Sequence, residues 1–425
     1  MKITPWLAAA VALVPVLQAC GGGSDSDGDG AVRLVNASSA YGALDLYSSD
    51  TLLSSAVAPE GAGSYVTLGA GTYTLKLKRN GSSTTVNSTD RSVAASTSHT
   101  LLAYSTADTL RSVFLTDNET APTSGAAKLR VFNASTEAGA LDVYVTASSA
   151  TLADSSPTVS ALGTERFSSY NEISAGSYRV RVTGSGDKTD LRLDIDGISL
   201  ADQRIGTLVL TTTPGGVLVN SLFIDQKSTV TGVANPSARI RLVAGAGSNG
   251  TVAATINGTS LSSGLRSPTV GAYALVPAGS LSGSVTLEGT ALTLPTATLA
   301  AGSDSTLLVT SAGGAGTATL IADDNKPAIT STNAKLRLVH GVGALGSSIT
   351  LTADYSAVAT DTPVNSASTP AAITAGTDMR LEATTPTATS SLFLDSAVTL
   401  VAGKVYTLFM LGDANAPAGV LRRDR

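Results

Sequence analysis

The sequence predicts an all-β protein: tandem antiparallel β-sandwich modules of immunoglobulin-like architecture, preceded by a signal peptide and a flexible tether. Three observations support this prediction. Apolar and polar residues alternate with a period of two, related segments recur at intervals that suit whole domains, and turn-forming residues recur at roughly the 8–12-residue spacing of sandwich folds. Beyond residue 20, no segment carries the apolar stripe of an amphipathic helix.

The first 19 residues resemble the signal peptide of a bacterial lipoprotein. Lys2 is followed by an apolar run, residues 3–17, which is shorter than the roughly 20 residues that a membrane-spanning helix needs. The run ends in Leu-Gln-Ala-Cys, which resembles the lipobox in which the cysteine is acylated and cleavage falls just before it. We therefore expect residues 1–19 to be removed and a lipid, such as palmitate, on Cys20 to anchor the chain. The alternative is an ordinary signal peptide with an incidental cysteine.

Residues 20–30 are expected to form the lipidated cysteine and its tether. The stretch GGGSDSDGDG that follows Cys20 cannot bury a core and is typical of a flexible linker. By resemblance to the lipoprotein sorting rule of proteobacteria, Gly21 favours the outer membrane. The same stretch matches the first half of an EF-hand loop, but the twelfth position, which should be a bidentate Glu, is Asn36. A solvated tether is therefore favoured over a calcium site.

Four related segments centred on an arginine predict four modules. The segment Val-Arg-Leu-Val-Asn-Ala-Ser around Arg33 recurs around Arg130, and weaker copies surround Arg241 and Arg337. The spacings between these arginines are 97, 111 and 96 residues, too long for a solenoid and suited to complete domains. The expected modules are residues 31–123, 127–228, 237–328 and 334–425, joined by linkers at 119–127, 228–237 and 326–334.

Alternation within each unit predicts half-buried antiparallel strands. In Tyr73-Thr74-Leu75-Lys76-Leu77-Lys78 the apolar residues share one face and the polar residues the other. Residues 178–182 repeat this pattern. Each unit is therefore expected to be a sandwich of about seven strands.

The arginine segment, a following Asp-x-Tyr segment and an Ala-Gly-x-Tyr segment together resemble a named family, the domain of unknown function numbered 4397. The first two units fit its pattern, except that Asn36 and Asn133 stand where the pattern has His. The fourth unit keeps the His as His340 but lacks Asp-x-Tyr, and the third keeps little beyond Arg241. The resemblance implies an extracytoplasmic β-fold and no established activity.

Two sets of polar residues are the candidate surface patch. If alternation turns the leucines inward and the first two strands form a hairpin, Arg33 becomes a cross-strand neighbour of Asp45 and both face solvent. One interpretation is a polar binding patch on two successive modules, and the other is an ion pair that fixes strand register. The residues in question are Arg33, Asp45 and Tyr47, with Arg130, Asp142 and Tyr144.

The composition and motifs indicate no catalytic site, no metal site and no cofactor. His99 and His340 are the only histidines, and the exchange of His340 with Asn at the equivalent positions suggests a hydrogen bond at a strand end. Cys20 is the only cysteine, so neither a disulfide nor a cysteine-based metal site is expected. Asp323, Asp324 and Asn325 are expected to form a solvated acidic turn.

Charge and aromatic content narrow the expected function. A formal net charge of −5 with scattered basic residues argues against binding of nucleic acid. Only 4% of residues are aromatic, which disfavours glycan binding without ruling it out. We expect a non-catalytic lipoprotein of the outer membrane with a structural, adhesive or protein-interaction role. The alternative is a lipoprotein that binds a glycan or small molecule between its modules.

Overall fold

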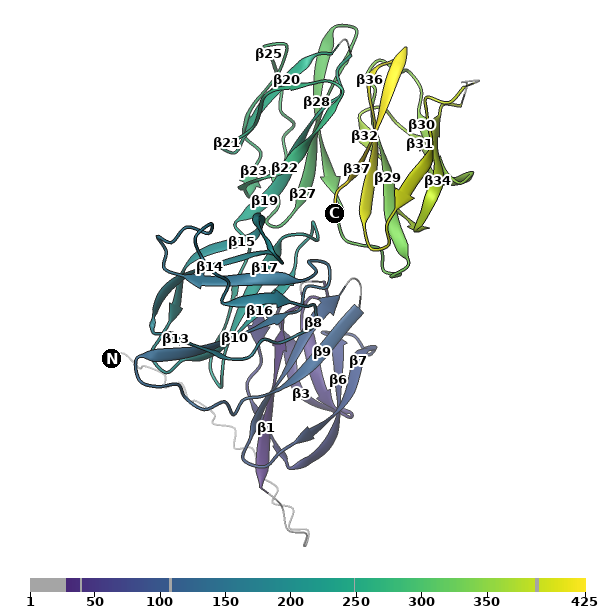
Figure 1. Cartoon of the computed structure of the whole chain (residues 1–425). Helices are drawn as coiled ribbons and strands as arrows, with labels where there is room; N and C mark the ends of the chain where they lie inside the picture. Colours follow the sequence, from purple (N-terminus) through teal and green to yellow (C-terminus); the bar gives the residue numbers. More distant parts are fainter. Residues whose placement is uncertain (1–27, 39, 107–108, 248, 387–389) are drawn as a thin grey trace, which may run out of the picture.

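The computed structural model describes residues 28–38, 40–106, 109–247, 249–386 and 390–425. Within these residues every regular element is a β-strand, and the strands form nine hydrogen-bonded sheets. Eight of these sheets form four consecutive modules of two facing sheets each, and the ninth is a two-stranded sheet in the third module (Figure 1). The predicted all-β fold of tandem sandwich modules is therefore confirmed. The signal peptide, Cys20 and most of the tether lie outside the described residues.

All four modules follow one plan. The first strand lies inside the first sheet, where it pairs in parallel with a strand late in the module, and the second strand begins the opposite sheet. Chain reversals are short hairpins, so most other pairs are antiparallel.

Module 1 has one sheet in the order β4-β1-β8-β9, to which β5 adds beside β1, and a second in the order β3-β2-β6-β7. Its strands are β1 (Asp29–Asn36), β2 (Leu44–Ser48), β3 (Thr51–Val57), β4 (Gly61–Ala62), β5 (Val66–Gly69), β6 (Gly71–Arg79), β7 (Thr85–Val93), β8 (Ser98–Thr106) and β9 (Thr109–Thr116).

Module 2 has sheets in the orders β13-β10-β16-β17-β18 and β12-β11-β14-β15. Its strands are β10 (Ala126–Asn133), β11 (Leu141–Thr146), β12 (Val159–Leu162), β13 (Asn171–Ser174), β14 (Gly176–Gly184), β15 (Asp187–Leu200), β16 (Ile205–Thr212), β17 (Val219–Asp225) and β18 (Val230–Val233). Because β18 pairs with β17, the segment predicted as a linker at 228–237 is partly an edge strand of module 2.

Module 3 has sheets in the orders β22-β19-β27-β28 and β21-β20-β24-β25, with β23 and β26 as a small additional pair. Its strands are β19 (Ser237–Ala244), β20 (Thr251–Ile256), β21 (Thr259–Arg266), β22 (Thr269–Pro277), β23 (Gly279–Ser280), β24 (Gly283–Leu287), β25 (Thr290–Leu292), β26 (Thr298–Leu299), β27 (Asp304–Ala312) and β28 (Ala315–Asp323).

Module 4 has one sheet in the order β32-β29-β36-β37, to which β33 adds beside β29, and a second in the order β31-β30-β34-β35. Its strands are β29 (Asn333–Gly341), β30 (Ile349–Ala353), β31 (Ser356–Thr362), β32 (Ser366–Ala367), β33 (Ala371–Thr374), β34 (Gly376–Thr384), β35 (Phe393–Leu400), β36 (Val405–Asp413) and β37 (Ala416–Arg423).

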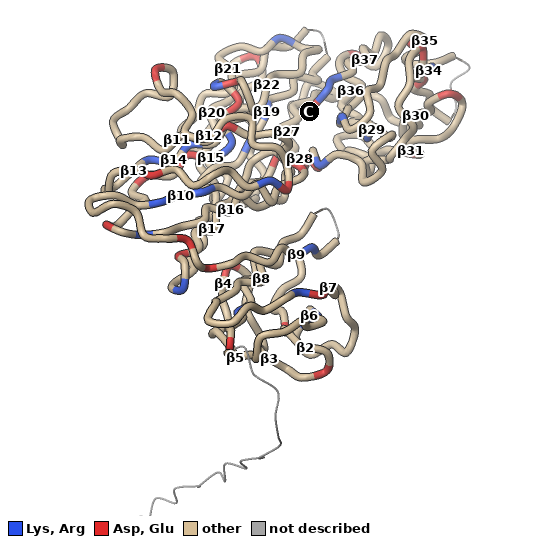
Figure 2. The backbone as a smooth tube through the Cα atoms, turned by 60° about the horizontal axis from the view of Figure 1, so that its bottom comes forward, with Lys and Arg blue, Asp and Glu red and all other residues tan. Residues whose placement is uncertain are grey.

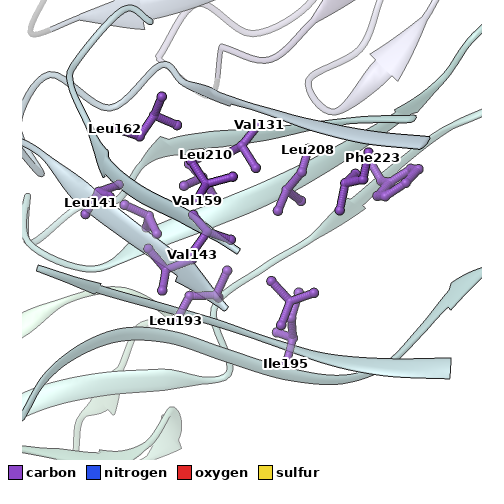
Figure 3. Packing of buried hydrophobic residues seen from close by; sticks show 14 of the residues in the cluster. Val131, Leu141, Val143, Val159, Leu162, Leu193, Ile195, Leu208, Leu210 and Phe223 are labelled. Carbon is purple, nitrogen blue, oxygen red and sulfur yellow. The ribbon is translucent and has the colours of Figure 1, made fainter. Parts of the chain in front are cut away.

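Each module has its own apolar core between its two sheets. In module 2, Val131 and Leu208 of the first sheet face Val143 and Leu193 of the second (Figure 3). Full burial of such side chains contributes roughly 1.5–3 kcal/mol each. With no disulfide expected, this packing is the main source of stability for each sandwich.

Modules also pack in pairs through the outer faces of their first sheets. Modules 1 and 2 share a cluster that includes Val35, Tyr104 and Phe132, and modules 3 and 4 share one that includes Val339 and Phe409. The first sheets are therefore buried on both faces, which explains why every residue of β1 from Val32 to Asn36 is buried or half-buried, Arg33 included. Each pair thus consists of four stacked sheets, with modules 3 and 4 together at the top of Figure 1.

Candidate functional site

An arginine at the centre of each first sheet is fixed by the parallel strand beside it. Each Nε donates a hydrogen bond to the hydroxyl of the directly opposite threonine, at 2.9 Å in modules 1 to 3 and 3.0 Å in module 4. Parallel register places the two residues side by side, so the pair recurs wherever the sequence supplies them. The pairs are Arg33–Thr100, Arg130–Thr207, Arg241–Thr306 and Arg337–Thr407.

In three modules the threonine hydroxyl donates a hydrogen bond in turn to a buried aspartate side chain. Thr100 donates to Asp117 at 2.7 Å and Thr306 to Asp323 at 2.7 Å, and Thr407 has the same bond to Asp424. Module 2 departs from this pattern, because the position equivalent to these aspartates is Gln226, which bonds to the backbone of residue 119 instead.

A tyrosine completes the cluster in modules 1 and 3. The Tyr65 hydroxyl donates to Asp117 at 2.8 Å, and that of Tyr273 donates to Asp323 at 2.5 Å. Burial raises the pKa of Tyr65 to about 12. The phenol therefore stays protonated near neutral pH and can donate to the carboxylate.

Between modules 3 and 4 the clusters form a reciprocal ion-pair network. Arg241 of module 3 pairs with Asp424 of module 4, while Arg337 of module 4 pairs with Asp323 of module 3 at 2.5 Å. Arg241 also lies 3.7 Å from Asp323, and none of the four side chains is more than 3% exposed. Equivalent residues thus contact each other in both directions, as in a two-fold symmetric dimer interface.

Asp323 and Arg241 of this network stay charged despite their burial. Burial alone would raise the pKa of Asp323, but the guanidinium groups of Arg337 and Arg241 outweigh it and lower that pKa. Burial opposes the charge on Arg241 too, yet Tyr273, Asp424 and Asp323 raise its pKa above the ordinary value. Asp323 and Arg241 are therefore both ionised near neutral pH.

In the described part of the interface between modules 1 and 2, the central arginines do not pair with buried aspartates as they do between modules 3 and 4. Arg33 donates to the backbone carbonyls of Ser228 at 2.5 Å and Asp225 at 3.0 Å. Arg130 lies over the rings of Phe167 and Tyr170, at 4.9 and 4.7 Å from their centroids. For Arg33 and Arg130, carbonyl hydrogen bonds and cation–π contacts thus take the place of the carboxylates that the arginines of modules 3 and 4 contact.

Shallow crevices open beside the arginines at equivalent places in the two pairs. One, of about 480 Å³, is lined by residues that include Arg33, Tyr65 and Lys227. The other, of about 430 Å³, is lined by residues that include Arg241, Tyr273 and Arg422. Among the described residues, no group of three or more His, Cys, Asp or Glu side chains is placed to hold a metal ion.

The predicted surface patch is wrong in both of its forms. In the described sheets, β1 pairs with β4, β5 and β8, whereas Asp45 lies on β2 in the opposite sheet. The first sheet is covered on its outer face, so Arg33 is buried. On the opposite sheets Asp45, Asp142 and Tyr144 are buried as well. Tyr47 on the opposite sheet of module 1 and Arg130 on the first sheet of module 2 are half-buried. The residues therefore form neither a cross-strand ion pair nor an exposed patch.

The aspartates of that predicted patch organise bulged edge strands instead. Asp45 accepts hydrogen bonds from the Ala56 N–H at 2.7 Å and from Asn80 at 3.1 Å. Asp142 accepts one from the Ala161 N–H at 2.6 Å and one from Gly186. Ala56 and Ala161 have φ of 53° and 48°, so each aspartate stabilises an unfavourable backbone conformation at a bulge.

The predicted strand-end hydrogen bond of His340 is confirmed. Asn36 donates to the carbonyls of Gly42 and Val57 and accepts from the backbone N–H two residues ahead, and Asn133 bonds in the same way. His340 bonds through Nε2 to the Ser347 carbonyl at 3.1 Å and accepts the Val342 N–H at Nδ1. Burial lowers the pKa of His340, which favours the neutral ring that this bonding requires.

Sequence reasoning missed the buried acids. Asp323 and Asn325 were expected in a solvated turn, yet both are buried within the contacts between modules. One signal was present, because the aspartate follows its threonine by 17 residues in modules 1, 3 and 4. The His99 ring stacks on the ring of Phe114, with 4.7 Å between the two centroids.

Basic and acidic residues are interspersed along all four modules, as Figure 2 shows. Among the residues that the structure describes, no helix has the length and apolar character needed to cross a membrane.

Comparison with solved structures gives only distant similarities. The Bacillus anthracis TIE protein has a TM-score of 0.14 and 8% identity, over 66% of this chain and 50% of that one. A family 26 carbohydrate-binding module of Eubacterium rectale Amy13K, in complex with maltoheptaose, has a TM-score of 0.16 and 10% identity, over 48% and 97%. The glycogen-degrading pneumococcal virulence factor SpuA has a TM-score of 0.16 and 10% identity, over 86% and 37%. This chain spans about half the length of the first, and scores this low support no statement about ligands.

No functionally curated protein matches the chain. A family model does match it, over residues 30–144 and 238–346, which together make up more than half of the 425 residues. The second match covers module 3, which keeps little of the family's sequence pattern beyond Arg241. The chain belongs to the family described as Domain of unknown function (DUF4397).

Proposed function

We propose that this protein is a non-catalytic lipoprotein of the outer membrane that acts as a rigid spacer and interaction scaffold of the cell envelope. A lipid on Cys20 anchors it, and the modules extend from the membrane. The observation that carries this proposal is the pairing of modules through buried faces, with a reciprocal ion-pair network between modules 3 and 4. Modules joined only by linkers would move independently.

Contacts between the two pairs support the same proposal. The turn between β16 and β17 enters the base of module 3, where the Gly215 N–H donates to the Gly302 carbonyl at 3.0 Å. Arg425 of module 4 donates to the Gly216 carbonyl at 2.8 Å. A Cβ on Gly215 would lie 2.8 Å from the backbone nitrogen of Asp304, so this close approach requires glycine.

Distance measurements test the rigidity of the scaffold. In the Cys20→Ser chain, spin labels on Ser83→Cys in module 1 and Thr290→Cys in module 3 should give one narrow distance distribution by pulsed electron paramagnetic resonance. Both positions are exposed, so the labels should leave the packing intact. A broad distribution would show that the pairs move freely, and the spacer proposal would be wrong.

Labelling and protease accessibility test the anchor and its location. Cells making the full chain should incorporate radiolabelled palmitate, and Cys20→Ala should abolish that label and release the protein from the membrane fraction. Retained label in Cys20→Ala would contradict the proposed anchor. Loss of a C-terminal epitope on protease treatment of intact cells would place the modules on the cell surface, and loss only after permeabilisation would place them in the periplasm.

The two equivalent crevices favour a second candidate, a lipoprotein that binds a small ligand between modules. Their volumes fall within the range of ligand sites, although both are open and their arginines are already hydrogen-bonded. Lys227→Glu and Arg422→Glu reverse a charge at the rim of each crevice without touching the cores. A ligand found in envelope extracts that binds the native chain and neither variant would establish this function over the scaffold.

A further inference from the structure

The turn between β30 and β31 presents an aromatic ring to solvent. Tyr355 is 80% exposed, more than the other large apolar side chains on the described surface. Asp354 and Tyr355 form the two-residue turn, and both have positive φ, 44° and 65°. Such a turn matches the twist of a hairpin, and it normally carries Asn-Gly or Asp-Gly because its second position suits glycine.

Module 3 shows what the same turn looks like without this ring. Its equivalent hairpin, between β20 and β21, turns on Asn257 and Gly258, with φ of 46° and 81°. A Cβ on Gly258 would meet nothing within 4 Å, so the space around this position is open. Module 4 therefore has Tyr355 at a turn position whose backbone conformation suits glycine better. The Tyr355 ring also buries little surface there. Folding alone does not explain Tyr355, and strained residues of this kind concentrate at functional sites.

Arg380 of β34 lies over this ring and is itself paired with Glu382. The Arg380 guanidinium lies 4.6 Å from the ring centroid, and its Nη1 is 2.6 Å from Glu382, which also bonds to Ser391. Arg380 and Glu382 point away from the core, because Leu381 between them is fully buried.

Asp354 precedes Tyr355 in the turn, and Leu394 belongs to the same surface of the sheet as Glu382. Asp354 accepts the Arg380 N–H at 2.8 Å, which ties the turn to the sheet. Leu394, directly opposite Glu382 on β35, is half exposed and extends the apolar surface. In Figure 1 this sheet, with β30, β31 and β34, lies on the side of module 4 that faces away from module 3.

We propose that this face of module 4, formed by Tyr355, Arg380, Glu382, Ser391 and Leu394, binds a neutral carbohydrate chain. A pyranose ring has an apolar C–H face that stacks on an exposed aromatic ring, and hydroxyl groups at its edge that need both donors and acceptors. Arg380 retains further N–H donors and Glu382 further lone pairs beyond their mutual contact. The pair is neutral overall, so it does not select a strongly charged polymer.

The shape of the face indicates a chain and not an isolated small molecule. The crevices beside Arg33 and Arg241 are lined by other residues, and the residues of this face stand on the outer side of a sheet, so we place the ligand along that sheet surface. One stacking contact and a few hydrogen bonds give weak binding, with a Kd on the order of 0.1–1 mM per site. This inference rests on the interaction role proposed above and names its partner class, yet it can be measured without the membrane anchor.

The test uses the full chain with Cys20→Ser and three neutral polysaccharides, dextran, a mixed-linkage β-glucan and hydroxyethyl cellulose, in affinity gel electrophoresis. At least one should retard the protein, and Tyr355→Gly should weaken that retardation at least tenfold. Tyr355→Phe, which keeps the ring, should retain it, and Leu52→Ser, which removes an exposed apolar side chain of module 1, should have no effect.

Thermal unfolding of the same variants separates binding from folding. Because glycine suits this turn, Tyr355→Gly should unfold at the same temperature as the parent chain or higher. Retardation by none of the three polysaccharides, or retardation that Tyr355→Gly leaves unchanged, would overturn the proposal. Salt-sensitive binding to dextran sulfate alone would overturn it too, since that polymer selects positive charge. Each of these results leaves the palmitate and distance experiments on the scaffold unaffected.

Discussion

The ion-pair network between modules 3 and 4 makes a quantitative prediction about Asp323→Asn. This substitution keeps the shape of the side chain but removes one of two carboxylates from a site that also holds Arg241 and Arg337. None of these side chains is more than 3% exposed, so the charge that loses its partner stays away from water. Breaking a buried ion pair from one side costs about 3–5 kcal/mol. That is about a fifth or more of the roughly 5–15 kcal/mol that stabilises a typical domain.

Urea unfolding followed by circular dichroism measures this loss on the Cys20→Ser chain. Asp50→Asn is the matched control, because Asp50 pairs with Lys76 at 3.1 Å but its side chain is 94% exposed. The control should cost about 0–1 kcal/mol. Adding Arg337→Met to Asp323→Asn should restore part of the loss, since the unpaired charge is then removed as well. If Asp323→Asn costs no more than the control, the network does not hold the two modules together and the reasoning is wrong.

Three further predictions concern other parts of the chain. Burial lowers the pKa of His340, so below the ordinary histidine pKa of about 6.5 the unfolded chain takes up a proton that the folded chain does not. Stability should therefore fall as the pH drops below that value. His340→Asn introduces the residue that module 1 has at Asn36. It should reduce the difference between the urea unfolding midpoints measured at pH 7.5 and at pH 5. Asp142→Ala leaves two backbone N–H groups without their acceptor and should cost about 1–3 kcal/mol, measured by the same unfolding assay. Gly215→Val places side-chain atoms against Asp304 and should broaden the label-to-label distance distribution while each pair stays folded.

The strands were predictable from sequence because period-two alternation follows directly from backbone geometry. Leu75 and Leu77 are buried in β6 as the pattern indicates, and the lysines between and beside them are half-buried. The exchange of Asn36, Asn133 and His340 also indicated a shared hydrogen bond, since an amide and a neutral imidazole can each donate and accept. These inferences hold because each depends on neighbours within one strand or one turn.

The orientation of the arginine strands was not predictable by the same rule. Alternation places Arg33 opposite the core, and an isolated sandwich would expose that face to water. In this chain a second module covers it, so the arginine is buried among Thr100 and backbone carbonyls more than 190 residues away in sequence. Val35, which alternation places on the same face as Arg33, was the available sign that both faces of β1 are buried. The sequence of β1 does not indicate which other sheet packs against its outer face, because that depends on contacts between modules.

The repeating unit of this chain is a pair of modules. Modules 1 and 3 have nearly equal arginine spacings, 97 and 96 residues, and both contain the complete set of Arg, Thr, Asp and Tyr. In module 2, Gln226 replaces the aspartate, and in module 4, Pro370 lies where register would place the tyrosine. Both family matches begin at the first strand of a pair and run into its second module. The first member of each pair thus keeps the full cluster, whereas the second member supplies the surface that covers it. Because the covering module contributes different groups in each pair, carbonyls in one and Asp424 in the other, the two interfaces are free to differ in strength while the arrangement of sheets stays the same.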